Sequence, residues 1–299
     1  MEPVHDIDFE RRFGGIARLY GAAGLARFQA AHVCVIGVGG VGSWVVEALA
    51  RSALGHITMI DLDHLAESNV NRQIHALTDT IGMAKVTALA QRIAQINPYC
   101  AVEQIEDFLT ADNLEQLIGN RCYDFIVDAI DNVRAKTALI AYCRTHKLRL
   151  VTIGGAGGQI DPTRIAVRDL CRTEQEPLLA KVRKRLRAEH GFPRGTKNKF
   201  GIDAVFSTEP LQFPQLQGNG VDEPADSADS SKSITGLNCA GYGSAVVVTA
   251  AFGLVAAAHV LRLLAQDEKT DSMQESTSIV CHQTGIPCDL PAPLQPSSA

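Results

Sequence analysis

The residues best suited to chemistry begin with a glycine-rich turn. The segment GVGGVG (37–42) follows an apolar run, HVCVI, and precedes a stretch with helical periodicity. Glycines let the backbone approach a phosphate closely, and the free N–H groups at a helix N-terminus attract anions. The pattern therefore predicts a nucleotide-phosphate cradle built by four glycines: Gly37, Gly39, Gly40 and Gly42.

Acidic residues end the next apolar run, HITMI (56–60), in the sequence IDLD (60–63). Asp61 stands where dinucleotide-binding enzymes place a carboxylate that accepts hydrogen bonds from ribose hydroxyls. Asp63 follows it closely and is a second candidate contact for the nucleotide. On these residues alone, an NAD-dependent oxidoreductase is a reasonable interpretation.

The polar loop after this run favours ATP over a dinucleotide. SNVNRQ (68–73) brings Arg72 near the expected pocket, and Lys85 follows on the next helical stretch. Two cations suit the charge of a triphosphate and its leaving pyrophosphate. Asp128 and Asp131 end another apolar run, where a carboxylate can hold Mg²⁺ against phosphates. The candidate nucleotide contacts therefore also include Ser68, Asn69, Asn71, Arg72, Lys85, Asp131 and Asn132.

A basic stretch, KVRKRLRAEHGFPRGTKNK (181–199), contains eight Lys or Arg residues and one acidic residue. It stands out on a chain of net charge −5. A solvated helix face is one interpretation, and a surface that follows the phosphates of a nucleic acid is the other. The candidates for phosphate contact are Lys181, Arg183, Lys184, Arg185 and Arg187.

Alternating apolar runs and helical stretches position these residues. Their order predicts an α/β, Rossmann-like fold with a doubly wound, mainly parallel sheet. One domain is expected over 8–265, with an edge strand in GGAGGQIDPTRIAV (154–167), a long crossover (171–238) and an apolar helix (239–265). The Pro-rich tail, 266–299, is expected to be disordered.

Composition indicates an ordinary cytoplasmic globular protein. The eight cysteines are scattered without a C-x-x-C pair, which favours free thiols in a reducing compartment and no zinc site. The acidic, polar start MEPVHDIDFE shows no signal peptide. The apolar segment 239–265 is long enough to span a bilayer, so membrane association is an alternative to a buried or subunit-interface helix.

These motifs together resemble a known enzyme group. GVGGVG, IDLD, SNVNRQ, Lys85 and DAIDN (128–132) resemble the adenylating domains of the ubiquitin-activating-enzyme superfamily. RFGGIARLYG (12–21), VNRQIHAL (70–77), GGAGGQIDPTRI (154–165) and VFSTE (205–209) are similar to tRNA threonylcarbamoyladenosine dehydratases. The resemblance covers about residues 8 to 265.

The resemblance implies ATP-dependent cyclisation of threonylcarbamoyladenosine, next to the anticodon of tRNA, through an acyl-adenylate. The glycine turn would cradle the phosphates and Asp61 the ribose. Asn71, Arg72 and Lys85 would contact the triphosphate, and Asp131 would bind Mg²⁺. The resemblance also implies a monovalent cation as a further cofactor. It implies two kinds of partner: a second copy of the chain in a homodimer, and a cysteine-desulfurase sulfur-acceptor system.

Many members of the superfamily hold zinc with two C-x-x-C pairs, which are absent here, and an arginine of related enzymes also has no direct counterpart. Sulfur-carrier activators carry an arginine that crosses the dimer interface, and Gly15 aligns with it here, which leaves Arg12 or Arg18 as substitutes. Cys239 lies where some relatives have a nucleophilic cysteine, but cyclisation requires no thioester. Two other hypotheses are adenylation of a sulfur-carrier or ubiquitin-like C-terminus and a non-catalytic tRNA-binding scaffold.

Overall fold

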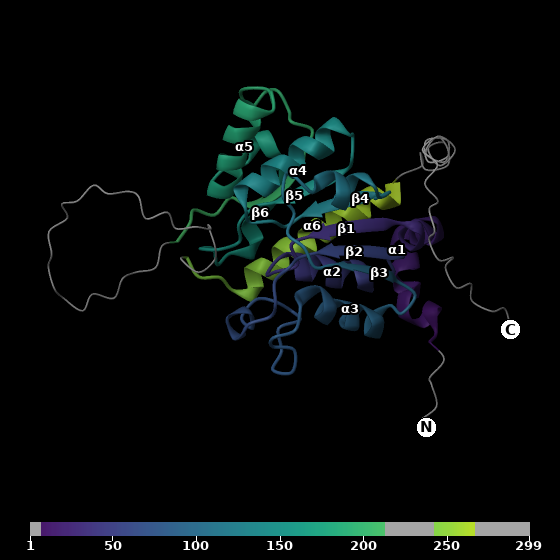
Figure 1. Ribbon diagram of the computed structural model, residues 1–299. Coiled ribbons are helices and arrows are strands. Elements are labelled where there is room, and N and C mark those ends of the chain that lie inside the picture. Colours follow the sequence, from purple (N-terminus) through teal and green to yellow (C-terminus); the bar gives the residue numbers. More distant parts are fainter. Residues whose placement is uncertain (1–6, 213–241, 267–299) are drawn as a thin grey trace, which may run out of the picture.

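A seven-stranded sheet organises the chain in this computed structural model, which describes residues 7–212 and 242–266 (Figure 1). The strand order is β3-β2-β1-β4-β5-β7-β6. Neighbouring strands pair in parallel except β6 and β7, which are antiparallel. The strands are β1 (His32–Ile36), β2 (His56–Ile60), β3 (Ala101–Ile105), β4 (Phe125–Asp128), β5 (Leu150–Ile153), β6 (Ile165–Asp169) and β7 (Asp203–Ser207).

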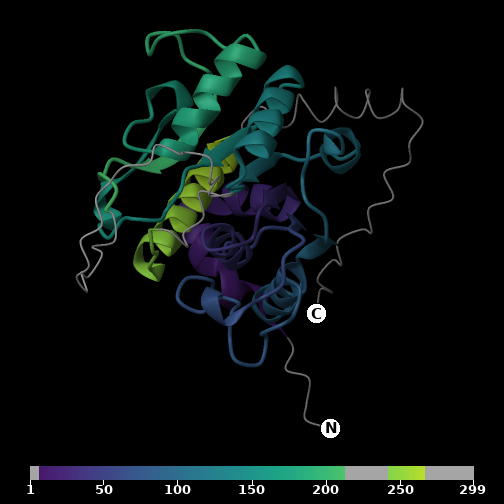
Figure 2. The ribbon, with the colours of Figure 1, turned by 60° about the vertical axis from the view of Figure 1, so that its left-hand side comes forward.

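Helices cover both faces of this sheet, as expected for a doubly wound fold. They are α1 (Phe9–Ala30), α2 (Gly42–Arg51), α3 (Lys85–Ile96), α4 (Val133–Thr145), α5 (Pro177–Glu189) and α6 (Val246–Gln266). Short turns complete the list: η1 (Glu67–Asn69), the π-helix η2 (Glu115–Gly119), η3 (Pro162–Arg164) and η4 (Leu170–Arg172). Figures 1 and 2 show α4 and α5 on one side of the molecule and α1, α2 and α3 on the other.

The alternation of side chains along each strand explains the two layers. Val33 and Val35 of β1 face a hydrophobic cluster that includes α2, α3 and α6. Cys34 and Ile36 face a second cluster that includes α4 and α5. Because both faces are covered, the inner strands are apolar throughout, which is why they were recognisable as continuous apolar runs.

The strand order reverses between β1 and β4. The chain first adds β2 and β3 on one side of β1 and then β4 and β5 on the other. In an open parallel sheet, such a switch point leaves a crevice at the carboxyl ends of the strands, where ligands bind. The glycine turn follows β1 and Asp131 follows β4, so the topology brings these two predicted elements together.

The region predicted as a crossover is partly an ordered piece of the sheet. Residues 203–207, which lie within the expected crossover, form β7 between β5 and β6. They were missed because a strand of five residues inside a polar stretch has too short a pattern to distinguish it from a loop. The edge strand predicted after the GGAGG segment is confirmed as β6. Residues 213–238 and the tail 267–299 lie outside the described residues.

Helix α6 is the only described helix long and apolar enough to cross a membrane, with a mean hydropathy of 2.0. It begins at Val246, later than the sequence suggested. One face packs closely on α2: a Cβ at Gly253 would lie 2.6 Å from the Val41 carbonyl oxygen and 2.7 Å from Trp44 Cβ. The helix therefore belongs to the folded core along that face.

Candidate active site

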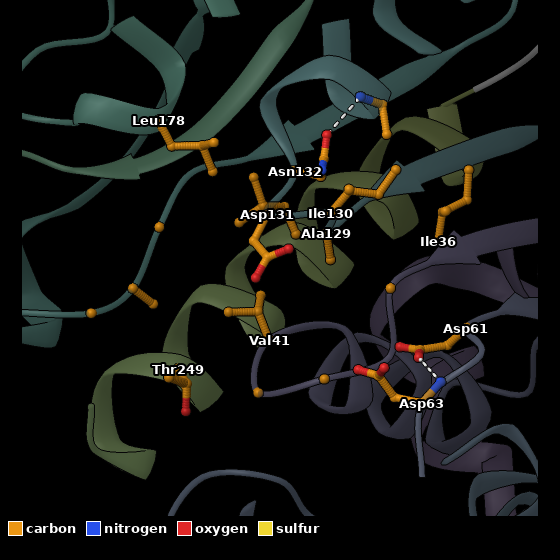
Figure 3. A pocket seen from close by; sticks show the side chains of 18 of the residues that line it. Ile36, Val41, Asp61, Asp63, Ala129, Ile130, Asp131, Asn132, Leu178 and Thr249 are labelled. Atoms are coloured by element: carbon orange, nitrogen blue, oxygen red, sulfur yellow. Dashed lines mark hydrogen bonds between the residues drawn. The ribbon is translucent and has the colours of Figure 1, made fainter. Parts of the chain in front are cut away.

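A cavity of about 1130 Å³ opens at the switch point of the sheet. It is lined by the ends of β1, β2, β4 and β5, the loop 68–73, the start of α5 and residues 242–244 before α6. Figure 3 shows Asp61 and Asp63 on one side of this space, Leu178 and Thr249 on the other, and Asp131 between them. All but one of the predicted nucleotide contacts line it; the exception is Gly42, the first residue of α2.

The glycine turn has little room for side chains. Gly37 has φ 81°, and a Cβ there would lie 2.9 Å from the Ala129 carbonyl oxygen. A Cβ at Gly42 would lie only 1.9 Å from the Gly37 carbonyl oxygen. Helix α2 begins at Gly42 without a side-chain cap. The turn therefore presents backbone N–H groups and a positive helix end to the cavity, which suits a phosphate.

Asp61 is fixed against this turn. It is 9% exposed, its Oδ2 accepts a hydrogen bond from the Val38 N–H at 2.7 Å, and its Oδ1 accepts one from the Asp63 N–H at 2.9 Å. Burial raises the pKa of Asp61, against the opposing effects of Lys85 and the two backbone hydrogen bonds. Each carboxylate oxygen keeps a second lone pair for a ribose hydroxyl.

Lys85 is held by Asp63 rather than left free. Its Nζ lies 2.6 Å from Asp63 Oδ2, and its side chain is 7% exposed against 52% for Asp63. Lys85 is the first residue of α3, so the helix fixes its backbone at the cavity wall. The ion pair with Asp63 therefore fixes the ammonium at the cavity wall.

Arg72 lies across the glycine turn. A Cβ at Gly40 would lie 3.2 Å from Arg72 Cγ and Cδ, so the absence of a side chain at Gly40 makes room for the arginine stem. The guanidinium donates from Nη1 to the Ser68 carbonyl at 2.7 Å and to Asn71 Oδ1 at 2.9 Å. Asn71 in turn donates from Nδ2 to the Ser244 carbonyl at 2.8 Å. These contacts tie the cationic loop to the segment before α6.

Three predicted contacts contribute to local structure. Ser68 offers its backbone carbonyl to Arg72. Asn69 Oδ1 accepts from the Ala66 N–H at 3.1 Å. Asn132 Oδ1 caps α4 by accepting from the N–H groups of residues 134 and 135, at 2.9 and 3.1 Å. Their placement beside the cavity agrees with the sequence, but these oxygens are engaged in turns and caps.

The two aspartates at the carboxyl end of β4 have different environments. Asp131 is exposed, points into the cavity (Figure 3), and has no hydrogen-bond or ion-pair partner for its carboxylate among residues 7–212 and 242–266. Asp128 is fully buried, pairs with the fully buried Lys136 at 2.8 Å and accepts from Thr152 Oγ1 at 2.7 Å. Asp128 is therefore engaged inside the fold, and of these two aspartates Asp131 is the one whose carboxylate faces the cavity.

Sequence reasoning missed the opposite wall of the cavity. It is formed by Gly154–Gly157 after β5, Glu176 and Leu178 at the start of α5, and Tyr242 before α6. Arg134 also lines the cavity, in the first turn of α4, where a cation opposes the helix dipole. The only sequence signal for this wall was the glycine-rich GGAGG segment, because the other residues come from distant parts of the chain.

The basic stretch divides into exposed and structural residues. Lys181 and Lys184 are exposed on α5. Arg183 donates to Thr173 Oγ1, and Arg185 pairs with Glu189 at 2.8 Å. Arg187 donates to the carbonyls of Pro193 and Gly195 and lies 5.2 Å from the centre of the Phe200 ring. The loop after α5 adds further exposed cations: Arg194, Lys197 and Lys199.

The two arginines considered for a partner's site also differ. Arg12 donates from Nη1 to the Gln95 and Ile96 carbonyls, at 3.2 and 2.9 Å, and so stabilises the end of α3. Arg18 is exposed on α1 and folds back over Gly14 and Gly15. Cys239 lies outside the described residues.

Comparison with known proteins gives consistent matches. The ThiF family model matches residues 13–283. A tRNA threonylcarbamoyladenosine dehydratase of Escherichia coli (strain K12) is 52% identical over 263 residues, covering 88% of this chain and 96% of that protein. One of Bacillus subtilis (strain 168) is 39% identical over 189 residues, covering 63% of this chain and 71% of that one.

A solved structure extends the similarity to three dimensions. The crystal structure of the E. coli tRNA N6-threonylcarbamoyladenosine dehydratase in complex with ATP has a TM-score of 0.75 at 49% identity. The match covers 86% of this chain and 94% of that one. The similarity therefore extends over most of the described chain, beyond the short motifs around the cavity.

Proposed function

The chain belongs to the ThiF family and, within it, to the tRNA threonylcarbamoyladenosine dehydratases, and from this premise we propose how it acts. It is an ATP-using adenylating enzyme that dehydrates threonylcarbamoyladenosine in tRNA to its cyclic form. One observation supports the assignment of chemistry to residues: the glycine turn, two cations and an unpaired carboxylate line a single cavity.

The chemistry starts from a carboxylate that is a poor electrophile, since its charge repels nucleophiles and oxide is a poor leaving group. An oxygen of the threonyl carboxylate attacks the α-phosphorus of ATP, and pyrophosphate leaves. A ureido nitrogen of the same modified base then attacks the acyl carbon and loses its proton. AMP leaves with the carboxylate oxygen, so the nucleoside loses the elements of one water. The second step is intramolecular, and positioning supplies much of its rate.

The residues of the cavity divide this work. The glycine turn and the start of α2 hold the phosphates, and Asp61 orients the ribose. Asn71 supports the Arg72 guanidinium, and Arg72 and Lys85 contact the triphosphate and stabilise the charge that develops as pyrophosphate leaves. Lys85 changes partner from Asp63 to phosphate when ATP binds.

The exposed carboxylate of Asp131 fits a Mg²⁺ ion, because Mg²⁺ near phosphates takes one or two protein carboxylates and keeps several waters. Bound there with ATP, the ion would neutralise phosphate charge. Asp131 itself orients the α-phosphate for attack. A monovalent cation is an additional ligand that the family resemblance supports, and no residue is assigned to it.

The partners extend beyond the ATP site. The substrate is tRNA carrying threonylcarbamoyladenosine, and the exposed cations on α5 and in the following loop contact its phosphates. The family resemblance also supports three further parts of the proposal: a homodimer, a cysteine-desulfurase sulfur-acceptor system as partner, and a cytoplasmic location.

The test is incubation with ATP, Mg²⁺ and modified tRNA, followed by nucleoside mass analysis. We expect loss of one water from the modified nucleoside and release of AMP. If the threonyl carboxylate carries ¹⁸O, the label should appear in AMP. Release of ADP with labelled phosphate would contradict adenylation. Pyrophosphate exchange that needs a carrier protein and no tRNA would favour sulfur-carrier activation, and NAD binding without ATP binding would favour an oxidoreductase.

A further inference from the structure

Glu176 is a buried acidic residue in the cavity wall that the chemistry above does not use. It is 5% exposed and precedes α5 directly. It lines the cavity beside Gly154–Gly157, through its contact with Gly155. Buried carboxylates are rare unless their oxygens are fully bonded, so its contacts indicate what it does.

The carboxylate accepts three backbone hydrogen bonds from two different elements. Oε1 accepts from the Gly155 N–H at 2.9 Å and from the Leu178 N–H at 3.3 Å, and Oε2 accepts from the Leu179 N–H. Two of these bonds cap α5, as an acidic N-cap residue normally does. The bond from Gly155 goes beyond a cap, because it joins the wall after β5 to the first turn of α5.

The glycines opposite Glu176 are shaped to receive it. A Cβ at Gly154 would lie 2.9 Å from Glu176 Cγ, and a Cβ at Gly155 would lie 3.2 Å from Glu176 Oε1. The contact therefore requires the absence of side chains on one partner and a long acidic side chain on the other. This explains two of the glycines in GGAGG without any contact to nucleotide.

We propose that Glu176 is a positioning residue that clamps the Gly154–Gly157 wall to α5 and so sets where the modified base lies relative to the α-phosphate. The proposal rests on the function proposed above. Helix α5 starts at this clamp and carries Lys181 and Lys184 on its exposed surface. Docking of RNA phosphates on α5 and the placement of the wall are then linked through one side chain.

The variant Glu176→Gln tests the clamp. An amide has one acceptor oxygen and one donor nitrogen, so either orientation puts an N–H donor against a backbone N–H, at Gly155 or at Leu179. We expect faster deuterium exchange at residues 154–157, a kcat about 10- to 100-fold lower, and a KM for ATP within about twofold of wild type. Asp8→Ala removes the carboxylate cap of α1 and is the matched control for loss of a cap alone.

Gly155→Ala tests the same contact from the other side, since its Cβ would crowd Glu176 Oε1. If both variants act through one contact, the double variant should have a kcat close to that of the less active single variant. Multiplicative losses, or unchanged exchange at 154–157 in Glu176→Gln, would overturn the clamp. If Asp8→Ala lowers both kcat and the melting temperature as much as Glu176→Gln does, Glu176 acts only as a helix cap. Absence of dehydration by the wild type would instead refute the function, while exchange still reports on the clamp.

Discussion

At the level of single residues, the charged groups of the cavity differ in what holds them. Lys85 is paired with Asp63 at 2.6 Å, the Arg72 guanidinium donates to oxygens of its own loop, and Asp131 is unpaired in the described chain. A charge that is positioned before the ligand arrives needs little reorganisation during the reaction. Arg72 and Asp131 therefore carry the clearest tests at this scale.

Replacing Arg72 by Ala should remove a cation from the leaving pyrophosphate without loss of the fold. We expect tRNA dehydration to fall about 100- to 1000-fold, the range for one lost transition-state donor. The measurement is single-turnover formation of the cyclic nucleoside, beside the melting temperature. Arg11→Ala, at an exposed arginine of α1, is the control. Turnover near the wild-type rate would contradict the role in triphosphate binding.

The two aspartates at the carboxyl end of β4 should respond differently to conversion to Asn. Asp131→Asn should raise the Mg²⁺ concentration needed for half-maximal turnover and leave the melting temperature unchanged, since its carboxylate has no partner in the described chain. Asp128→Asn leaves the buried Lys136 without its counter-ion, which costs about 3–5 kcal/mol and lowers the melting temperature by roughly 10 °C. A Mg²⁺ requirement unchanged in Asp131→Asn would argue against its role in metal binding.

At the level of elements, α5 combines structural arginines with exposed lysines. Reversing Lys181 and Lys184 to Glu should weaken tRNA binding and reduce the slope of log K against log salt by about one per lost phosphate contact. Arg187→Glu should mainly destabilise the loop that its guanidinium holds through Pro193 and Gly195. Binding measured across a salt series, with melting curves, separates the two effects. An unchanged salt slope for the lysine variants would place the RNA elsewhere.

The elements also show what the sequence could and could not predict. Long apolar runs and helical periods gave the parallel sheet, and the order of motifs located Gly37, Asp61, Arg72, Lys85 and Asp131 around one cavity. Strand β7 was missed because its pairing with β5 and β6 is a non-local property. For the same reason, the partner of Asp128 and the second wall around Glu176 followed only from tertiary packing.

At the level of the whole molecule, the question is whether α6 packs in the fold or anchors the protein in a membrane. Its apolar character allows a span, yet Val248, Phe252, Ala256 and Val260 are fully buried against the rest of the chain. Withdrawing the helix would expose these side chains and uncover the sheet. The loss is on the order of 10 kcal/mol, which is comparable to the total stability of a typical domain. We therefore infer that α6 stays in the fold.

Vesicle flotation tests this inference. With vesicles of phosphatidylethanolamine and phosphatidylglycerol, the wild type should remain at the bottom of the gradient. Leu254 is 48% exposed on the outer face of α6, so Leu254→Glu should behave identically and keep the melting temperature. Ala256→Glu puts a charge at a fully buried position and should abolish folding. If the wild type floats and Leu254→Glu does not, the exposed face of α6 binds the bilayer surface. If both proteins float, the helix inserts into the bilayer. Either result would contradict the inference that α6 serves only the folded core, because a helix that only covers the sheet does not bind lipid.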